Sequence, residues 1–581
     1  MIEIEKKIEK LLIDIIDRDF NIKLDLVNLE LPPKKDLWDF SFWCFVLSKE
    51  LKKNPNEIAN ILSNILENEL LIEKTGVVWP YLNLTINKTI YRDIFSDLFF
   101  SKKDIIKNNK TIVIDYIWAN VWKPLHIWHM CTPNQWQVMI NVYRVLWYNV
   151  ISDSHIWDWW IIFWKLITAY KKWWDKNKLE EDAVNYLLEL YIKITSETEV
   201  IWEELENEIR NEFKKLSLWE KESVELWSMF TKYSILSMNK QLERLNVKPD
   251  FNIWESFYEG LWLPKMGDYP DLEFDMKSIV FELLDKNIAT KNEDWSVWII
   301  FEEKTKIPSC ILQKRDWTHW YLASDLAAVK YRVTNWNPDK IIYFVDSRQQ
   351  LHLKQVFEVS RKAWWINQTE LFHAYNGFIS LKDWAMSTRK WRIIKLDSLL
   401  NEAEKRAEKI ILEKRDDISW DELVKLSKII WIWAIKYWYL KKSRETDVIF
   451  DWDEFMTFDG NSWPYIQYAY VRAIRILEKS WISFEEKTSA NFSSNEEVEL
   501  LKSILNFESI LIKSTHNNTP HVICEYTYKL TKVFSSFYNN IHILSEEDID
   551  TKILRLQLVS KFAETIKKSF SILWIDMPEK M

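Results

Sequence analysis

The residues best suited to chemistry are two histidines, His126 and His129, which follow an apolar segment at residues 111–116. Such a segment is typical of a buried parallel strand, and a long helical pattern comes after it. Histidines at i and i+3 share one face of a helix, and the exposed amides of a helix N-terminus favour anions. If glycine stood in place of Trp128, an adenine could lie against the backbone while the imidazoles donate to phosphate oxygens. This pattern favours a nucleotide site, but a metal pair and a surface HxxH stay open as alternatives.

A second candidate site is the segment 386–390, which contains Met386, Ser387 and Lys390. Hydroxyl and cationic side chains in one loop can donate to a polyphosphate. Alone, such a loop is most often ordinary basic surface. The histidine pair about 260 residues earlier makes a two-part nucleotide site a reasonable interpretation.

Length and composition narrow the class of protein. A chain of 581 residues is expected to fold as two to four domains, and 48% hydrophobic with 28% charged residues is typical of a globular protein. The net charge of −9 means that any contact with nucleic acid must use local basic patches. The four cysteines form no CxxC pair, which argues against a zinc site of known spacing and a disulfide scaffold. We therefore expect no protein metal site, no membrane span and a cytoplasmic location.

One pair of counts is abnormal. The chain has 5 glycines and 36 tryptophans, and the 41 residues together match the roughly 7% of glycine in average proteins. Tryptophan occupies turn contexts that glycine usually fills, as in Asp294-Trp295-Ser296 and Asn335-Trp336-Asn337.

Our hypothesis is that the source reads UGA as glycine and that the printed sequence renders those codons as tryptophan. A protein with many genuine exposed aromatic rings is the alternative, and UGG codons at these positions would establish it. Trp159, Trp365 and Trp452 are expected to be genuine tryptophans.

The elements that must position these residues suggest an α/β protein in three parts. Residues 1–108 look like a small α/β domain, which begins with an amphipathic helix and ends in a strand at 81–86. Residues 109–396 look like a Rossmann-like parallel-sheet domain, with a helical insertion at about 166–246 and a further strand at 340–345. Residues 397–581 look entirely helical, with a boundary near 459–462.

Seven separated segments resemble the arginyl-tRNA synthetases, a family of class I aminoacyl-tRNA synthetases. These are DYIWANVWKPLHIWHM (115–130), HIWDWWIIFWKL (155–166), YLASDLAAVKYR (321–332), IIYFVDSRQQLHLKQVF (341–357), AMSTRKW (385–391), FDWDEFMTFDGNSWPYIQYAYVRA (450–473) and the closing ILWIDMPEKM. Each family glycine in these segments is tryptophan here.

The resemblance implies an enzyme that joins ATP and L-arginine into arginyl-adenylate and then transfers the arginyl group to tRNA(Arg). Mg²⁺ is expected to accompany ATP, and the family suggests a monomer. The arginine substrate would be held by five residues that match family positions: Asp115 and Asn120 at the amino-acid head group, Tyr321 and Asp325 at the guanidinium, and Gln349 as a further contact. From the residues alone, Tyr321 and Asp325 could equally form an ordinary hydrogen bond on a helix face.

His126 and His129 match the family's HIGH motif and are expected to stabilise charge on the transferring phosphoryl group. The signature loop departs from the family, because Ala385 and Thr388 stand where lysines are common. Lys390 remains in that loop, and we expect Lys123 to supply the missing cation. ATP contacts are expected from six residues, namely His126, Trp128, His129, Met386, Ser387 and Lys390.

The C-terminal helices resemble the family's anticodon-binding domain, where aromatic and Arg side chains can stack on unpaired bases. Candidate tRNA contacts there are Tyr465, Gln467, Tyr468 and Arg472, although any one of the tyrosines could be a core residue. The N-terminal domain resembles the family's tRNA-elbow module. Two rival functions stay open: a class I synthetase for another amino acid, and a non-catalytic synthetase-like protein that binds tRNA.

Overall fold

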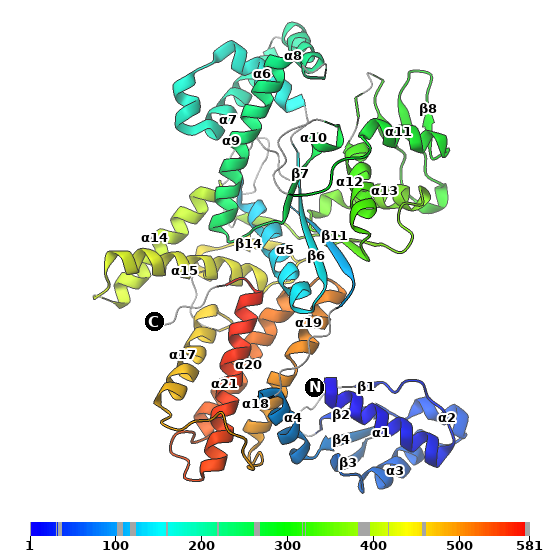
Figure 1. Cartoon of the computed structure of the whole chain (residues 1–581), viewed down its shortest axis with the longest axis vertical. Coiled ribbons are helices and arrows are strands. Elements are labelled where there is room, and N and C mark those ends of the chain that lie inside the picture. The colour runs from blue at the N-terminus through cyan, green and yellow to red at the C-terminus, as the bar shows by residue number, and fades with distance from the viewer. Residues whose placement is uncertain are drawn as a thin grey trace.

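The structure is a computed structural model. It describes residues 2–30, 32, 38–78, 80–100, 108–116, 124–157, 161–200, 202–217, 220–260, 268–315, 318–319, 321–381, 395–415, 417–455 and 460–575. Figure 1 shows an N-terminal sheet-and-helix unit beside a bundle of C-terminal helices, with a sheet-containing region beyond them. None of the helices described is both long and apolar enough to cross a bilayer.

The N-terminal unit packs helices on an antiparallel sheet with strand order β1-β2-β4-β3. The predicted amphipathic helix is α1, and its Ile4, Ile8, Leu12 and Ile15 are buried. The predicted strand 81–86 is β4. Helix α4 contacts α18 of the C-terminal bundle, and Lys502 forms an ion pair with the buried Asp39 across this junction. The elements are α1 (Ile2–Phe20), β1 (Leu29–Glu30), β2 (Phe40–Trp43), α2 (Phe45–Leu51), α3 (Pro55–Leu66), β3 (Ile72–Val78), β4 (Tyr81–Ile86) and α4 (Lys88–Phe100).

The central sheet positions the candidate site. Among the described residues its five strands are all parallel, in the order β12-β11-β5-β6-β7. The chain runs outward from β5 to β6 and β7, and then returns to place β11 on the other side of β5. This reversal between β5 and β11 is a topological switch point, where open parallel sheets bind ligands beyond the carboxyl ends of their strands. The strands are β5 (Thr111–Tyr116), β6 (Asn149–Ile156), β7 (Phe251–Trp254), β11 (Lys340–Tyr343) and β12 (Glu370–His373).

Most helices of this middle region either cover the sheet or extend from it. Helix α5 packs on β5 and β6, and α12 packs on α13. In the described part of residues 161–244 the chain forms the helices α6, α7, α8 and α9, which project from the sheet in Figure 1. The elements are α5 (Ile127–Val145), α6 (Ile161–Trp173), α7 (Lys176–Val200), α8 (Trp202–Ser217), α9 (Lys221–Arg244), α10 (Glu255–Tyr258), α11 (Met276–Asp285), β8 (Ala289–Lys291), β9 (Val297–Ile299), η1 (Glu303–Thr305), β10 (Cys310–Gln313), α12 (Tyr321–Trp336), η2 (Ser347–Gln349), α13 (Gln350–Lys362) and β13 (Ile379–Leu381).

The C-terminal part is almost wholly helical, as the sequence predicted, apart from β14, which pairs in parallel with β13. Its long helices α17, α20 and α21 lie side by side in Figure 1. The elements are α14 (Leu396–Lys414), α15 (Trp420–Leu440), β14 (Val448–Phe450), α16 (Trp452–Phe455), α17 (Trp463–Lys479), α18 (Asn495–Leu505), α19 (Phe507–His516), α20 (His521–Asn540) and α21 (Ile549–Ile572).

The backbone conformation at several tryptophans supports the hypothesis that glycine belongs at those positions. Among the described residues, four tryptophans adopt left-handed conformations, at φ values of 62° (Trp147), 69° (Trp295), 58° (Trp364) and 57° (Trp574). Glycine enters this region without a Cβ clash, whereas other residues pay about 1–2 kcal/mol. By contrast, Trp365 donates its indole N–H to Glu282 Oε1 at 2.8 Å, a specific contact suited to a genuine tryptophan.

The neighbours Trp364 and Trp365 therefore provide a matched test. In protein made with the printed sequence, we expect Trp364→Gly to raise the apparent melting temperature by a few degrees, because it relieves about 1 kcal/mol of backbone strain. The Trp364 side chain is 80% exposed, so little packing is lost. Trp365→Gly should lower the melting temperature, because the contact with Glu282 disappears. A lower melting temperature for Trp364→Gly would contradict the glycine hypothesis at this position.

Candidate active site

The histidine pair lies where α5 begins, at the carboxyl end of β5. His126 is the extended N-cap residue of α5, with φ of −130° and ψ of 176°. Its backbone N–H donates to Nδ1 of His129 at 3.1 Å, and the two rings lie 3.9 Å apart between centroids. Because Nδ1 of His129 accepts this bond, the neutral ring carries its proton on Nε2. His129 can therefore donate a hydrogen bond from Nε2 beside the N-terminus of α5.

A buried ion triad lies beneath the sheet's carboxyl edge. Arg332 of α12 contacts Asp115 of β5 at 2.8 Å and Asp153 of β6 at 2.6 Å, and all three side chains are at most 1% exposed. Burial works against the charged guanidinium, but the two carboxylates hold the pKa of Arg332 well above its usual range. Burial also raises the pKa of Asp153, in spite of its contact with Arg332. Arg332 thus links α12 to two adjacent strands. It also pairs with one carboxylate oxygen of Asp115, the residue that is predicted to hold the amino-acid head group.

The first turns of α12 bring the predicted guanidinium contacts together. Tyr321 and Asp325 lie four residues apart on this helix, and Asp325 is buried. Burial raises the pKa of Tyr321 to about 12, and the nearby carboxylates of Glu255 and Asp325 add to the shift. Tyr321 therefore stays a neutral phenol that can donate a hydrogen bond at physiological pH.

Glu255 is a second buried carboxylate at this place, and the sequence analysis missed it. It begins α10 directly after β7, it is 3% exposed, and it accepts a hydrogen bond from Ser324 Oγ at 2.8 Å. Two buried carboxylates, Glu255 and Asp325, thus lie close enough to Tyr321 to act on its pKa. Their combined negative charge favours a cationic ligand at this place.

Of the other predicted substrate and ATP contacts, Gln349 can be placed in the structure and six residues cannot. Gln349 closes η2 after β11, so the fold brings it to the same edge of the sheet as Asp325. Six predicted residues cannot be placed: Asn120, Lys123, Met386, Ser387 and Lys390 lie outside the described residues, and Trp128 lies in α5 with its side chain outside the description.

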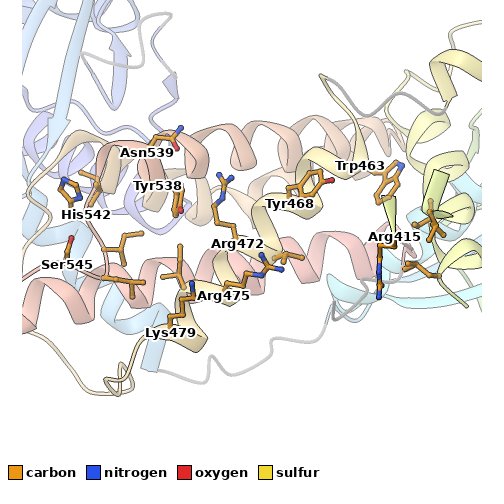
Figure 2. Close-up of a pocket in the computed structure, with 18 of the residues that line it drawn as sticks. Arg415, Trp463, Tyr468, Arg472, Arg475, Lys479, Tyr538, Asn539, His542 and Ser545 are labelled. Carbon is orange, nitrogen blue, oxygen red and sulfur yellow. The ribbon is translucent and has the colours of Figure 1, made fainter. Parts of the chain in front are cut away.

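A large groove lies far from these residues, along α17 of the C-terminal bundle. Its volume is about 930 Å³, and Figure 2 shows Tyr468, Arg472, Arg475 and Lys479 of α17 along it. These four residues follow helical spacing on the exposed face of α17. Arg472 lies over the ring of Tyr538, 4.5 Å from its centroid, so the groove contains both aromatic and cationic groups.

Two predicted tRNA contacts do not line this groove. Gln467 is completely buried on the opposite face of α17, so it packs within the bundle. The Tyr465 hydroxyl donates to Ser535 Oγ at 3.3 Å, and its ring packs against Tyr528. The groove instead contains Arg475 and Lys479, which the sequence analysis missed although they lie three and seven residues after Arg472.

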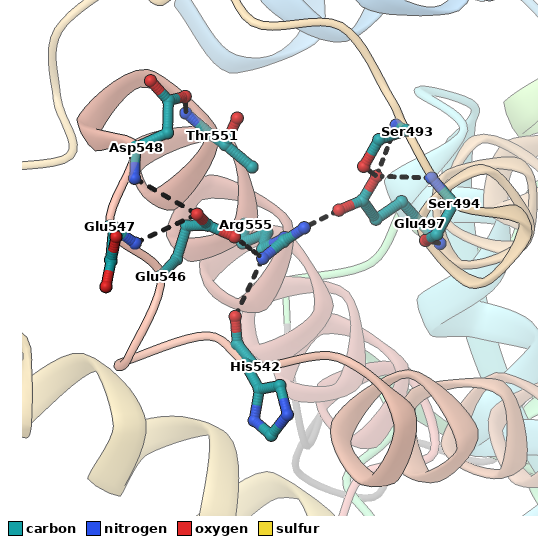
Figure 3. A network of polar contacts seen from close by, with 9 residues as sticks. All are labelled: Ser493, Ser494, Glu497, His542, Glu546, Glu547, Asp548, Thr551 and Arg555. Carbon is teal, nitrogen blue, oxygen red and sulfur yellow. Dashed lines mark hydrogen bonds and ion pairs between the residues drawn. The ribbon is translucent and has the colours of Figure 1, made fainter.

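One wall of the groove is the segment 541–545, which an ion network holds in place (Figure 3). Arg555 of α21 donates to the backbone oxygen of His542 at 2.8 Å and forms an ion pair with Glu546. It also donates to Glu497 Oε1 at 2.7 Å, and the other oxygen of Glu497 accepts the backbone N–H of Ser494 at 3.0 Å. Arg555 therefore ties this wall to α18.

Comparisons with known proteins agree with this architecture. Three family models match: "tRNA synthetases class I (R), catalytic domain" at residues 95–452, "DALR anticodon binding domain" at 466–581 and "Arginyl tRNA synthetase N terminal domain" at 3–86. The arginine–tRNA ligase of Clostridium perfringens is 36% identical, with 99% of this chain and 100% of the relative covered. That of Clostridium botulinum strain 657 is 33% identical, with 97% and 98% covered.

Solved structures share the fold. The arginyl-tRNA synthetase of Plasmodium falciparum superposes with a TM-score of 0.80 at 23% identity, covering 99% of both chains. The enzyme of Thermus thermophilus gives a TM-score of 0.78 at 19% identity, covering 99% of this chain and 100% of the other. Because a class I catalytic model spans most of the chain and relatives align along nearly all of it, the chain belongs to the arginyl-tRNA synthetase family.

Proposed function

We propose that this protein is an arginine–tRNA ligase. It joins ATP and L-arginine into arginyl-adenylate with release of pyrophosphate, and it then passes the arginyl group to the 3′-terminal ribose of tRNA(Arg). Family membership supports the reaction class. The observation that supports arginine as the amino acid is the pair of buried carboxylates, Glu255 and Asp325, near Tyr321.

The cluster of Tyr321, Asp325 and Glu255 at the start of α12 suits a guanidinium better than an ammonium. A guanidinium is planar and has five N–H donors, so it can bond a carboxylate through two parallel hydrogen bonds while it also faces further acceptors. Lysine presents a compact point charge without that fork. Asp325 is proposed as the bidentate partner, with Glu255 and Tyr321 beside it. Asp115 and Asn120 are proposed to hold the amino-acid head group, and Gln349 is proposed as a further contact to the arginine.

ATP is proposed to bind at the N-terminus of α5. Exposed amides there favour phosphate oxygens, and His129 can add a donor from Nε2. His126 and His129 would stabilise the charge that develops as pyrophosphate leaves. Mg²⁺ is proposed to arrive with the ATP phosphates. This part of the proposal also includes Lys123, Lys390, Met386 and Ser387. The residue at position 128 is proposed to be small enough to leave room for adenine.

The groove on α17 is proposed to receive unpaired bases of the tRNA anticodon. Tyr468 is 53% exposed and can stack on a base, while Arg472, Arg475 and Lys479 can contact phosphates. The three-part division at 1–108, 109–396 and 397–581, with the insertion at about 166–246, is part of the proposal. The proposal also includes a tRNA contact by the N-terminal domain, a monomeric state and a cytoplasmic location.

ATP–pyrophosphate exchange tests the amino-acid assignment. With tRNA(Arg) present, we expect exchange with L-arginine and none with lysine or other amino acids. Asp325→Asn should lower kcat/KM for arginine about 30-fold or more, because it removes one partner of a buried charge pair, and it should leave the KM for ATP unchanged. Asp285→Asn, on the exposed end of α11, is the matched control. Exchange with another amino acid, or tRNA binding without any exchange, would favour one of the rival functions.

Binding of tRNA(Arg) at fixed salt concentration tests the groove. Tyr468→Ala should weaken binding about 5- to 150-fold, because stacking of one base contributes about 1–3 kcal/mol. Arg475→Gln should reduce the slope of log affinity against log salt by about one. Trp481→Ala is a control, since its ring is 99% exposed just beyond α17 and outside the groove. Equal affinities for Tyr468→Ala and Trp481→Ala would contradict an anticodon contact here.

A further inference from the structure

The carboxylate of Asp325 is held from outside its own helix. Its Oδ2 lies 2.6 Å from Nε2 of His352, which belongs to α13. An ionised carboxylate can only accept hydrogen bonds, so Nε2 of His352 must carry the proton. The side chain of Asp325 is 7% exposed and that of His352 is 20% exposed, so this short bond is largely shielded from water.

A second histidine faces the other oxygen. Nε2 of His155, at the end of β6, lies 3.6 Å from Oδ1 of Asp325, and its side chain is 1% exposed. Burial lowers the pKa of His155, so its ring is uncharged at neutral pH. An uncharged His155 adds no positive charge beside the Asp325 carboxylate, which therefore keeps its attraction for a cationic ligand.

We propose that His352 is a positioning residue for arginine, whose Nε2–H fixes the rotation of the Asp325 carboxylate so that it can accept a guanidinium bidentately. This inference rests on the proposed function, because it takes Asp325 as the guanidinium partner. His352 acts only through Asp325 and does not itself contact the substrate.

The geometry explains why such a residue is needed. Rotation about the last side-chain bond of an aspartate is soft, whereas a bidentate pair requires the carboxylate plane to coincide with that of the guanidinium. A donor on the neighbouring helix α13 removes this freedom before the substrate arrives, and misplacement by about 1 Å can cost orders of magnitude in rate. His352 also follows Gln349 by three residues, so one short segment would carry both this positioning residue and the proposed further arginine contact.

The test compares two substitutions that differ in one property. His352→Gln places an amide N–H close to the position of Nε2, and His352→Leu keeps bulk without a donor. In ATP–pyrophosphate exchange with tRNA(Arg), His352→Leu should raise the KM for arginine about 10-fold or more, with the KM for ATP unchanged within about twofold. His352→Gln should restore the KM for arginine to within about threefold of the unsubstituted protein. His516→Leu, on the exposed end of α19, is the surface control.

Three results would overturn the inference: an unchanged KM for arginine in His352→Leu, equal impairment in His352→Gln and His352→Leu, or a parallel rise of both KM values with a lower melting temperature. Asp325→Asn, measured alongside, separates this failure from failure of the proposed function. If Asp325→Asn leaves arginine activation intact, the proposed pocket is wrong and the role of His352 fails with it. If Asp325→Asn abolishes activation while His352→Leu behaves as the unsubstituted protein, only the inference on His352 fails.

Discussion

The rest of the catalytic region depends on one buried cation, Arg332, held between the carboxylates of Asp115 and Asp153. Burying such charges is costly unless each has a close partner, and removing one partner strands the others. Here the guanidinium joins α12 to the two central strands β5 and β6. The start of α12 carries Tyr321 and Asp325, so the position of these two proposed arginine contacts depends on the Arg332 ion pairs.

Two neighbouring places at the carboxyl edge of the sheet favour ligands of opposite charge. At the end of β5, the N-terminus of α5 and the donor on His129 favour an anion. At the ends of β6 and β7, the negative charges of Asp325 and Glu255 favour a cation, whereas the carboxylates of Asp115 and Asp153 pair with Arg332. Both sites lie beyond the carboxyl ends of adjacent parallel strands. This arrangement can hold ATP phosphates and an arginine side chain apart while bringing their reacting groups together.

Local sequence patterns predicted the helices and strands well. They predicted less well the roles of residues that depend on tertiary packing. The apolar run 111–116 is β5, and α17 begins at Trp463, just after the predicted boundary. The strand expected at 340–345 ends at Tyr343. Gln467 was expected to face tRNA, but the apolar face of α17 turns it into the bundle. Glu255 gave no local signal, because a single acidic residue becomes notable only when the fold buries it beside Asp325.

Amide hydrogen exchange, measured by mass spectrometry on Arg332→Met and on the unsubstituted protein, tests the central claim most directly. Methionine fills much of the same space but cannot pair with either carboxylate. The account predicts that protection falls in β5, β6 and α12, while α18, α20 and α21 keep theirs. Unchanged protection in α12 and β5 would contradict the claim that the pairing of Arg332 with Asp115 and Asp153 holds α12 on strands β5 and β6.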